Sequence, residues 1–182
     1  MIYLETHRLL LRSCTLSDVD NLVELDADPA VMAYLTGGVP TPREVIERET
    51  LPWILREYDR VPGCGRWAVV EKSSGDFLGW LALESPGDTA VEVELGYRLR
   101  RSAWGKGYAT EGSRALIHQA FTELGTQRVY AQTMAVNSAS RRVMEKAGLR
   151  YARTFYLEFD DPIPGTEFGE VEYELLRSDW AN

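Results

Sequence analysis

The sequence predicts an α/β protein built on a mixed, mostly antiparallel sheet of about seven strands, with helices on both faces. Three apolar runs in the middle of the chain are separated only by the short turns Ser73–Asp76 and Ser85–Asp88, and such turns join antiparallel neighbours. Amphipathic patterns with helical spacing precede and follow these runs. The 182 residues contain no repeat and no linker-like segment, so we expect a single domain over residues 1–182.

A strand and two helices are expected before the central strands. Leu9–Arg12 is an apolar run of strand length, and the helical pattern of Val19–Leu25 follows Ser17, a residue type common at helix starts. A second helix is expected to begin near Thr41, because the proline that follows suits the first helical position. A kink is expected around Pro52, since proline inside a helix removes an N–H donor.

The three central strands should form a meander, in the order Trp67–Val70, Phe77–Leu83 and Val91–Leu99. The third strand alternates between two kinds of residue. One face carries Val91, Val93, Leu95, Tyr97 and Leu99, and the other carries Glu92, Glu94, Gly96 and Arg98. We therefore expect one face of this strand to enter the core and the other to meet a polar environment.

Two helices and three strands are expected after the central strands. A glycine-rich loop leads into a helix over Ala109–Leu124, and a strand at Val129–Thr133 and a short helix at Ser138–Ala147 follow. The last two strands are expected at Tyr151–Phe159 and Val171–Leu176, on either side of a loop.

Composition and charge exclude several classes of function. The formal charge of −8 argues against a nucleic-acid partner, whose binding face is basic. An acidic surface either draws in a cationic amine or serves only solubility. Cys14 and Cys64 form no metal or disulfide pattern, so we expect no metal site and a reducing compartment. No apolar run reaches the ~20 residues of a membrane helix. The N-terminus lacks the layout of a secretory signal, so we expect a cytoplasmic protein without a membrane partner.

The segment Arg100–Thr110 carries the main chemical signal. A glycine-rich turn from a strand into a helix leaves backbone N–H groups free, and the helix dipole favours an anion there. Glycine also lets a ligand approach the backbone closely. The surrounding cations are Arg98, Arg100, Arg101 and Lys106, with no acidic residue between Leu95 and Thr110. These features favour a phosphate or pyrophosphate ligand.

Other glycine-loop interpretations fit less well. A phosphate loop of the Walker type needs a lysine followed by serine or threonine after its second glycine, and the sequence has none at that spacing. A dinucleotide-binding fingerprint needs a third glycine where Thr110 stands, and a parallel sheet instead of a meander, which disfavours a nucleotide-binding oxidoreductase. A structural turn without a ligand stays open.

At these residues the chain resembles the GNAT superfamily of acyl-CoA-dependent N-acyltransferases. The family's loop has glutamine or arginine, two residues, glycine, one residue, then glycine or alanine. Trp104, Gly107 and Ala109 take those positions, and the tryptophan departs from the usual polar residue. Asn137 and Ser140 resemble the family's short helix beside the cofactor, although both residues are also common at helix starts.

Two further segments narrow the resemblance. Thr6–Arg12 and Glu94–Tyr97 are similar to the branch that contains acetyltransferases of ribosomal-protein N-termini, with alanine or serine acceptors. The resemblance implies a GNAT-like fold and acetyl-CoA as co-substrate. It leaves the acceptor open between a protein N-terminus and a small-molecule amine, and the assembly open between monomer and homodimer.

The resemblance also implies the residues that hold the cofactor. The cofactor would be held by Leu99, Arg101, Trp104, Gly105, Lys106, Gly107, Tyr108, Ala109, Thr110, Asn137 and Ser140. Glu94 is the expected general base, with Glu92 in reserve, and Ser140 is the expected acid for the departing thiolate. Tyr97 and Tyr151 are alternative proton donors, although a core role suits tyrosines on apolar strand faces. Tyr34, Trp53 and Glu94 are the expected acceptor contacts.

The sequence thus predicts an N-acetyltransferase in which the amine attacks acetyl-CoA directly, within a ternary complex. The alternatives are an acyl-CoA-binding module without turnover and a transferase for a longer acyl group such as succinyl.

Overall fold

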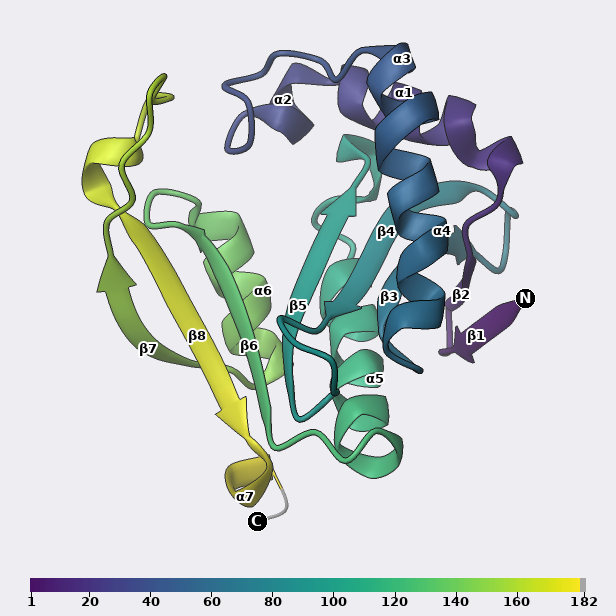
Figure 1. Ribbon diagram of the computed structural model, residues 1–182, viewed down its shortest axis with the longest axis vertical. Helices are drawn as coiled ribbons and strands as arrows, with labels where there is room; N and C mark the ends of the chain where they lie inside the picture. The colour runs from purple at the N-terminus through teal and green to yellow at the C-terminus, as the bar shows by residue number, and fades with distance from the viewer. Residues whose placement is uncertain (181–182) are drawn as a thin grey trace.

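The computed structural model describes residues 1–180, and one eight-stranded sheet runs through them (Figure 1). The spatial order of the strands is β1-β2-β3-β4-β5-β6-β8-β7. The strands are β1 (Ile2–Glu5), β2 (Leu9–Ser13), β3 (Gly65–Glu71), β4 (Phe77–Glu84), β5 (Glu92–Leu99), β6 (Arg128–Met134), β7 (Arg150–Phe155) and β8 (Glu170–Leu176).

Every neighbouring pair of strands is antiparallel except β5 and β6, which are parallel. Their pairing covers only Glu92–Glu94 of β5 against Arg128–Tyr130 of β6. Beyond it β5 remains paired with β4 to Leu99, and β6 remains paired with β8 to Met134. The two strands diverge in Figure 1, so the sheet opens in its middle.

The helices divide between the two faces of the sheet (Figure 1). On one face lie α1 (Val19–Ala27), α2 (Pro29–Met32), α3 (Arg43–Val45) and α4 (Leu51–Arg60), with α3 and α4 joined by the π-helix Ile46–Thr50. The long helix α5 (Tyr108–Glu123) and the shorter α6 (Ser138–Ala147) lie on the other. A last turn, α7 (Arg177–Trp180), follows β8.

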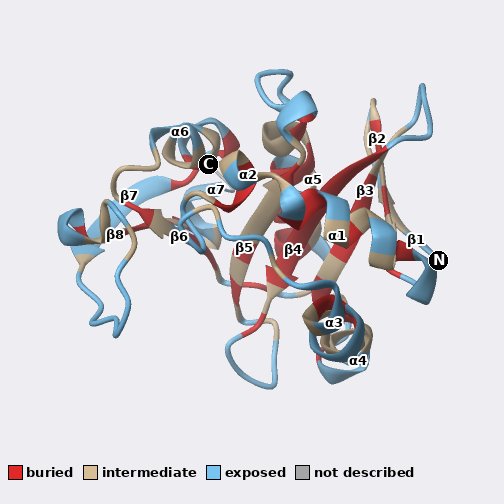
Figure 2. Ribbon diagram, turned by 90° about the horizontal axis from the view of Figure 1, so that it is seen from above, coloured by how far each residue is buried: buried red, intermediate tan, exposed pale blue. Residues whose placement is uncertain are grey.

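Each face of the sheet has its own apolar core. Leu22, Leu25, Ile46, Leu51 and Ile54 pack on Ala68, Trp80 and Ala82 of β3 and β4. On the other face Leu116, Ile117, Ala120, Phe121 and Met144 pack on strand residues such as Leu81, Val93 and Leu95. Strand β4, with a core on both sides, is buried over all but its last residue (Figure 2). The predicted alternation is confirmed within β5, since Val93, Leu95 and Leu99 are buried. Val91, which was also expected on the buried face, lies before the strand begins and is exposed.

The predicted fold class is confirmed, with differences in detail. The sheet has an eighth strand, because Ile2–Glu5 pairs with β2. Strand β7 ends at Phe155 instead of Phe159, so the final loop is longer than expected. Ser17 does not cap the first helix; the Asp18 carboxylate accepts the Thr15 N–H at 2.8 Å and fixes that corner. The expected irregularity near Pro52 is the π-helix that ends directly before Leu51.

Gly79 determines how closely β4 approaches β5. Its φ of +137° is one that other residues rarely adopt, and a Cβ there would lie 2.1 Å from the Arg98 carbonyl oxygen and 2.8 Å from the Leu99 Cα. These backbone atoms cannot move aside without breaking the hydrogen bonds between β4 and β5, which position the end of β5. The glycine therefore fixes the strand that leads into the glycine-rich loop.

We predict that Gly79→Ala lowers the free energy of unfolding by about 3 kcal/mol or more, because steric overlap adds to backbone strain. Gly75→Ala is the matched control, since Gly75 has φ +79° and a Cβ there would meet nothing within 4 Å. It should cost about 1–2 kcal/mol from backbone strain alone. Urea denaturation measures both, and equal losses would contradict the steric argument.

Candidate active site

The opening between β5 and β6 begins directly after the pair Glu94–Tyr130. Glu94 lies on the sheet face that also carries Arg66 and Glu84. Glu84 is the residue of β4 that pairs directly with Glu94 of β5. Glu94 is thus half-buried at the point where the sheet parts. The opening places a carboxylate from β5 near the unpaired parts of both strands.

The glycine-rich loop sits at the far end of β5. After Leu99 the chain makes the 3-10 turn Arg101–Ala103, and Gly107 then caps α5 with φ +82°. The cap provides no side-chain hydrogen bond, so the first N–H groups of α5 keep their donor capacity for a ligand. These groups and the helix dipole favour an anion at this end of the helix.

The loop requires glycine at Gly105 and Gly107 because both residues have a positive φ, and the space beside both residues is open. Gly105 has φ +73°, and a Cβ there would meet nothing within 4 Å. A Cβ on Gly107 would meet only Nη2 of Arg8, at 3.5 Å. The residues Gly105, Lys106 and Gly107 are exposed. A ligand can therefore approach this backbone from outside, as a phosphate-binding loop requires.

Trp104 stabilises the loop through a hydrogen bond that the sequence did not indicate. Its indole Nε1 donates a hydrogen bond to the Leu99 carbonyl oxygen at 2.8 Å, while the residue as a whole remains 47% exposed. This bond ties the loop back to the end of β5. The tryptophan thus stabilises the loop itself, whatever its side chain contributes to binding.

The N-terminal motif Thr6–Arg12 forms hydrogen bonds with the first turn of α5 and stabilises it. Glu111 accepts hydrogen bonds from the Thr6 hydroxyl at 2.6 Å, the Arg8 N–H at 2.9 Å and Arg8 Nε at 2.7 Å. Arg8 Nη1 also donates to the Lys106 carbonyl oxygen at 2.9 Å, and its guanidinium stacks on Tyr108. Sequence reasoning missed Arg8 because nothing local to it points to a loop almost a hundred residues away.

The local excess of positive charge seen in the sequence is largely neutralised in the fold. Arg98 pairs with Asp26 at 2.6 Å, and Arg100 pairs with Glu24 at 2.8 Å. Arg101 reaches Asp28 at 3.4 Å and stays 67% exposed. Helix α1 and its C-terminal end supply all three carboxylates. Charge alone therefore gives only weak support for an anion site, and the main support comes from the backbone geometry of the loop.

Asn137 and Ser140 lie at the start of α6. The Asn137 side-chain oxygen accepts the Ser140 N–H at 3.2 Å, and its amide donates to Thr133 Oγ1 at 3.1 Å, so Asn137 caps the helix. The Ser140 Oγ lies 2.9 Å from the Tyr97 hydroxyl of β5. Burial raises the pKa of Tyr97 to about 12, so this hydroxyl keeps its proton.

Glu94 has the electrostatic character of a base. Burial raises the pKa of its carboxyl, and the nearby charges of Glu84 and Glu172 raise it further, against a hydrogen bond with Tyr130. A raised pKa makes the carboxylate a better proton acceptor near neutral pH. Glu92, the reserve candidate, is instead paired with Arg128 at 3.0 Å.

The expected acceptor contacts lie on separate elements. Tyr34 follows α2 and is 42% exposed. Trp53 of α4 lines a surface hollow with Arg66, whose guanidinium lies 5.1 Å from the centre of the Trp53 ring. Arg66 in turn pairs with Glu84 at 2.7 Å, beside Glu94. Trp53 is therefore connected to the region of the base through Arg66 and Glu84, whereas Tyr34 lies on a separate segment after α2.

Over residues 1–180, no group of three or more His, Cys, Asp or Glu side chains is placed to hold a metal ion. Within the same residues, no helix has the length and apolar character needed to cross a membrane.

Comparison with known proteins agrees with the fold. A family model described as "Acetyltransferase (GNAT) domain" matches residues 8–150. The chain is 40% identical over 166 residues to the FsC-acetyl coenzyme A-N(2)-transacetylase of Aspergillus fumigatus, covering 87% of this chain and 69% of that protein. The structure resembles a GNAT-family acetyltransferase from Bacillus anthracis, with a TM-score of 0.76 and 24% identity over 98% of this chain and 99% of that one.

A second structural neighbour contains coenzyme A. It is the spermidine N-acetyltransferase of Vibrio cholerae in complex with CoA and spermine, with a TM-score of 0.77 and 18% identity over 97% of this chain and 100% of that chain. The family match and the fold together place the chain in the class of acyl-CoA-dependent acyltransferases. The chain belongs to the GNAT acetyltransferase family, whose members use acetyl-CoA, and it is an acetyltransferase.

We predict that Gly107→Val weakens CoA binding about tenfold or more, because a side chain at φ +82° obstructs the approach to the N-terminus of α5. Gly125→Val is the matched control, since Gly125 has φ +71° with equally open surroundings at the other end of the helix. Titration calorimetry measures both affinities. Undiminished CoA binding by Gly107→Val would remove the loop from the site.

Proposed function

We propose that this protein transfers an acetyl group from acetyl-CoA to a primary amine by direct attack, with Glu94 as general base and Ser140 as hydrogen donor to the thiolate. The observation that carries the proposal is the opening of the sheet. Glu94 on β5 and Ser140 on α6 flank it from opposite sides, and the glycine loop follows from β5.

Acetyl-CoA supplies the activated thioester and a thiolate leaving group. The residues present suit it, because the start of α5 offers uncapped N–H donors beside Gly105 and Gly107. Arg101 and Lys106 are exposed beside them and add positive charge. Ala109, Thr110 and Asn137 complete the proposed binding surface, whereas the side chains of Leu99 and Tyr108, which were also expected there, are buried.

Glu94 accepts the proton that the acceptor ammonium must lose before it attacks. Its raised pKa matches this task, and its charge attracts the ammonium form. Ser140 presents a hydroxyl where negative charge develops on the departing sulfur, and a donor aimed at developing charge lowers the barrier.

The loop after β7 supports a cationic acceptor. The chain from residue 154 to residue 176 contains seven Asp and Glu residues and no Lys, Arg or His. Glu172 and Glu174 are paired with Arg128, but Glu158, Asp160 and Asp161 belong to the exposed loop. Such a loop raises the local concentration of ammonium ions.

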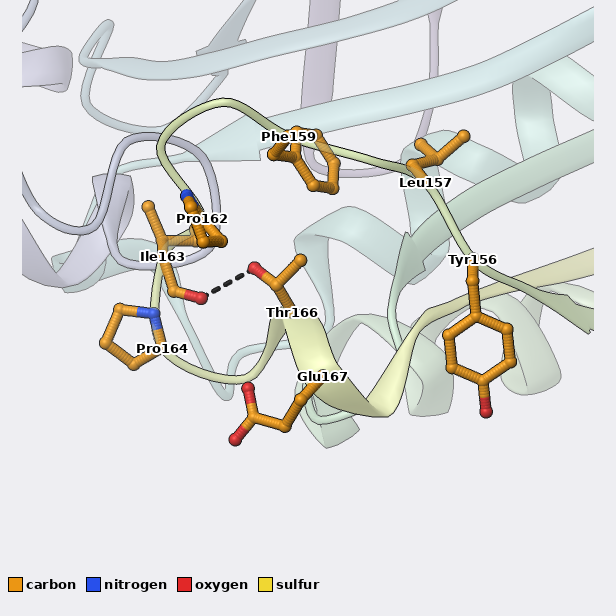
Figure 3. Close-up of a pocket in the computed structure, with 8 residues that line it drawn as sticks. All are labelled: Tyr156, Leu157, Phe159, Pro162, Ile163, Pro164, Thr166 and Glu167. Atoms are coloured by element: carbon orange, nitrogen blue, oxygen red, sulfur yellow. Dashed lines mark hydrogen bonds between the residues drawn. The ribbon is translucent and has the colours of Figure 1, made fainter.

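An apolar hollow of about 570 Å³ lies within this loop (Figure 3). It is lined mainly by Tyr156, Leu157, Phe159, Pro162, Ile163 and Pro164. The Thr166 hydroxyl donates to the Ile163 carbonyl oxygen at 2.6 Å and shapes the turn. A Cβ on Gly37 would lie 3.1 Å from Ile163, so the loop after α2, which also carries Tyr34, borders the same region. We propose that this region receives the body of the acceptor.

Two of the similar proteins support a small-molecule amine as the acceptor. The relative that is 40% identical is named an N(2)-transacetylase, and the Vibrio cholerae neighbour is a spermidine acetyltransferase. We extend the class of acceptor, a small amine, from these proteins to this chain.

The proposal is tested by following thiol release from acetyl-CoA with a panel of small amines, diamines and peptides. Release that depends on a small amine supports the proposal. Release only with peptides would move the acceptor to protein N-termini. Binding of acetyl-CoA without release for any amine would favour a binding module, and release from succinyl-CoA in place of acetyl-CoA would indicate a wider acyl pocket.

We predict that Glu94→Gln lowers kcat about 100-fold, in the range of general-base catalysis, and changes CoA affinity less than about threefold. In the wild type, the rate should rise with pH through the raised pKa of Glu94, because only the ionised carboxylate accepts a proton. That acidic limb should vanish in Glu94→Gln. Glu92→Gln is the control on the same face; if it abolished activity while Glu94→Gln did not, Glu92 would be the base.

A further inference from the structure

The hydrogen bond between Tyr97 and Ser140 is a side-chain contact that crosses the opening of the sheet. Tyr97 lies on β5 beyond its last pair with β6, and Ser140 lies in the first turn of α6, which packs beside β6 (Figure 1). The Tyr97 hydroxyl is 2.9 Å from Ser140 Oγ and 3.0 Å from the Ser140 carbonyl oxygen. The two halves of the site are therefore joined at the serine.

The two hydroxyl hydrogens of this contact, those of Tyr97 and Ser140, can be placed in two ways. Tyr97 has one hydroxyl hydrogen and two acceptors within reach. When Tyr97 donates to the carbonyl oxygen, Ser140 donates its own hydrogen to the tyrosine oxygen. When Tyr97 donates to Ser140 Oγ, the serine hydrogen is free for a third group. An anion beside the serine favours the second arrangement, because a hydrogen bond to a charged acceptor is the stronger one.

We propose that Tyr97 is a positioning residue that holds the Ser140 hydroxyl in the opening between β5 and β6 and turns its hydrogen towards the sulfur of coenzyme A. The inference rests on the proposed function of Ser140. In addition, it assigns a role to Tyr97, which acts on the sulfur only indirectly, by orienting the hydroxyl of Ser140.

The surroundings of Tyr97 suit this role. Its ring packs against the core on the α5 side of the sheet, which fixes the position of the hydroxyl. Burial raises its pKa to about 12, so the tyrosine remains a neutral hydrogen-bond donor throughout the working range. Without it, Ser140 would be free to rotate among its staggered rotamers.

A binding measurement tests the inference without turnover. CoA and desulfo-CoA, which lacks the sulfur, are titrated into wild-type protein and into Tyr97→Phe, Ser140→Ala and the double variant. We predict that each single variant lowers the ratio of CoA affinity to desulfo-CoA affinity about fivefold, the equivalent of one hydrogen bond. The double variant should lower it no further, because the two residues act as one unit.

The matched control is Tyr3→Phe. The Tyr3 hydroxyl of β1 also donates to a backbone carbonyl, that of Gly63, at 2.8 Å, and it belongs to no part of the site. This variant should lose comparable stability and leave the affinity ratio unchanged. In the activity assay, Tyr97→Phe should lower kcat about tenfold while the KM for acetyl-CoA stays within about twofold.

The outcomes separate the inference from the proposed function. If Ser140→Ala lowers the affinity ratio and Tyr97→Phe does not, the positioning role is wrong and the role of Ser140 stands. If neither variant changes the ratio, Ser140 does not face the sulfur, and that part of the proposed function fails as well.

Discussion

The site depends on one constraint, the separation of β5 from β6 after three paired residues. Each strand keeps its ladder with its outer neighbour, β4 or β8, so the sheet opens without losing the stability of either half. The facing edges then hold backbone groups that no longer pair with each other, and such groups need other partners. A polar, extended ligand can satisfy them, and the residues of the proposed mechanism lie along this opening.

Three supports keep the opening and its loop in place. Gly79 lets β4 lie against the end of β5, and the Trp104 indole ties the loop to Leu99. Arg8 and Thr6 hold Glu111 in the first turn of α5. The carboxylate at that position would by itself oppose an anionic ligand, and the Arg8 guanidinium offsets its charge. The N-terminal motif is thus a structural support of the loop that we propose as the cofactor site.

Much of the fold could be predicted because local patterns determine it. The alternation in β5 and the glycine turn before α5 each reflect a local rule, and both predictions were confirmed. Strand β1 was missed because Ile2–Glu5 is too short and too exposed to show a pattern. The charge argument failed in part because Asp26 and Glu24 are distant in sequence from Arg98 and Arg100. The role of each candidate side chain depends on such distant contacts, and the sequence shows only the residue types.

The central claim is that the glycine loop and the open edge of β5 together hold coenzyme A. Hydrogen exchange of backbone amides, followed by mass spectrometry with and without saturating acetyl-CoA, tests it directly. We expect slower exchange at residues 105–110 and at the amides within residues 95–99 that do not pair with β4, because ligand contacts protect amides that have no other partner. Unchanged exchange in both segments, with protection confined to the hollow at residues 156–167, would contradict the account and place the cofactor elsewhere.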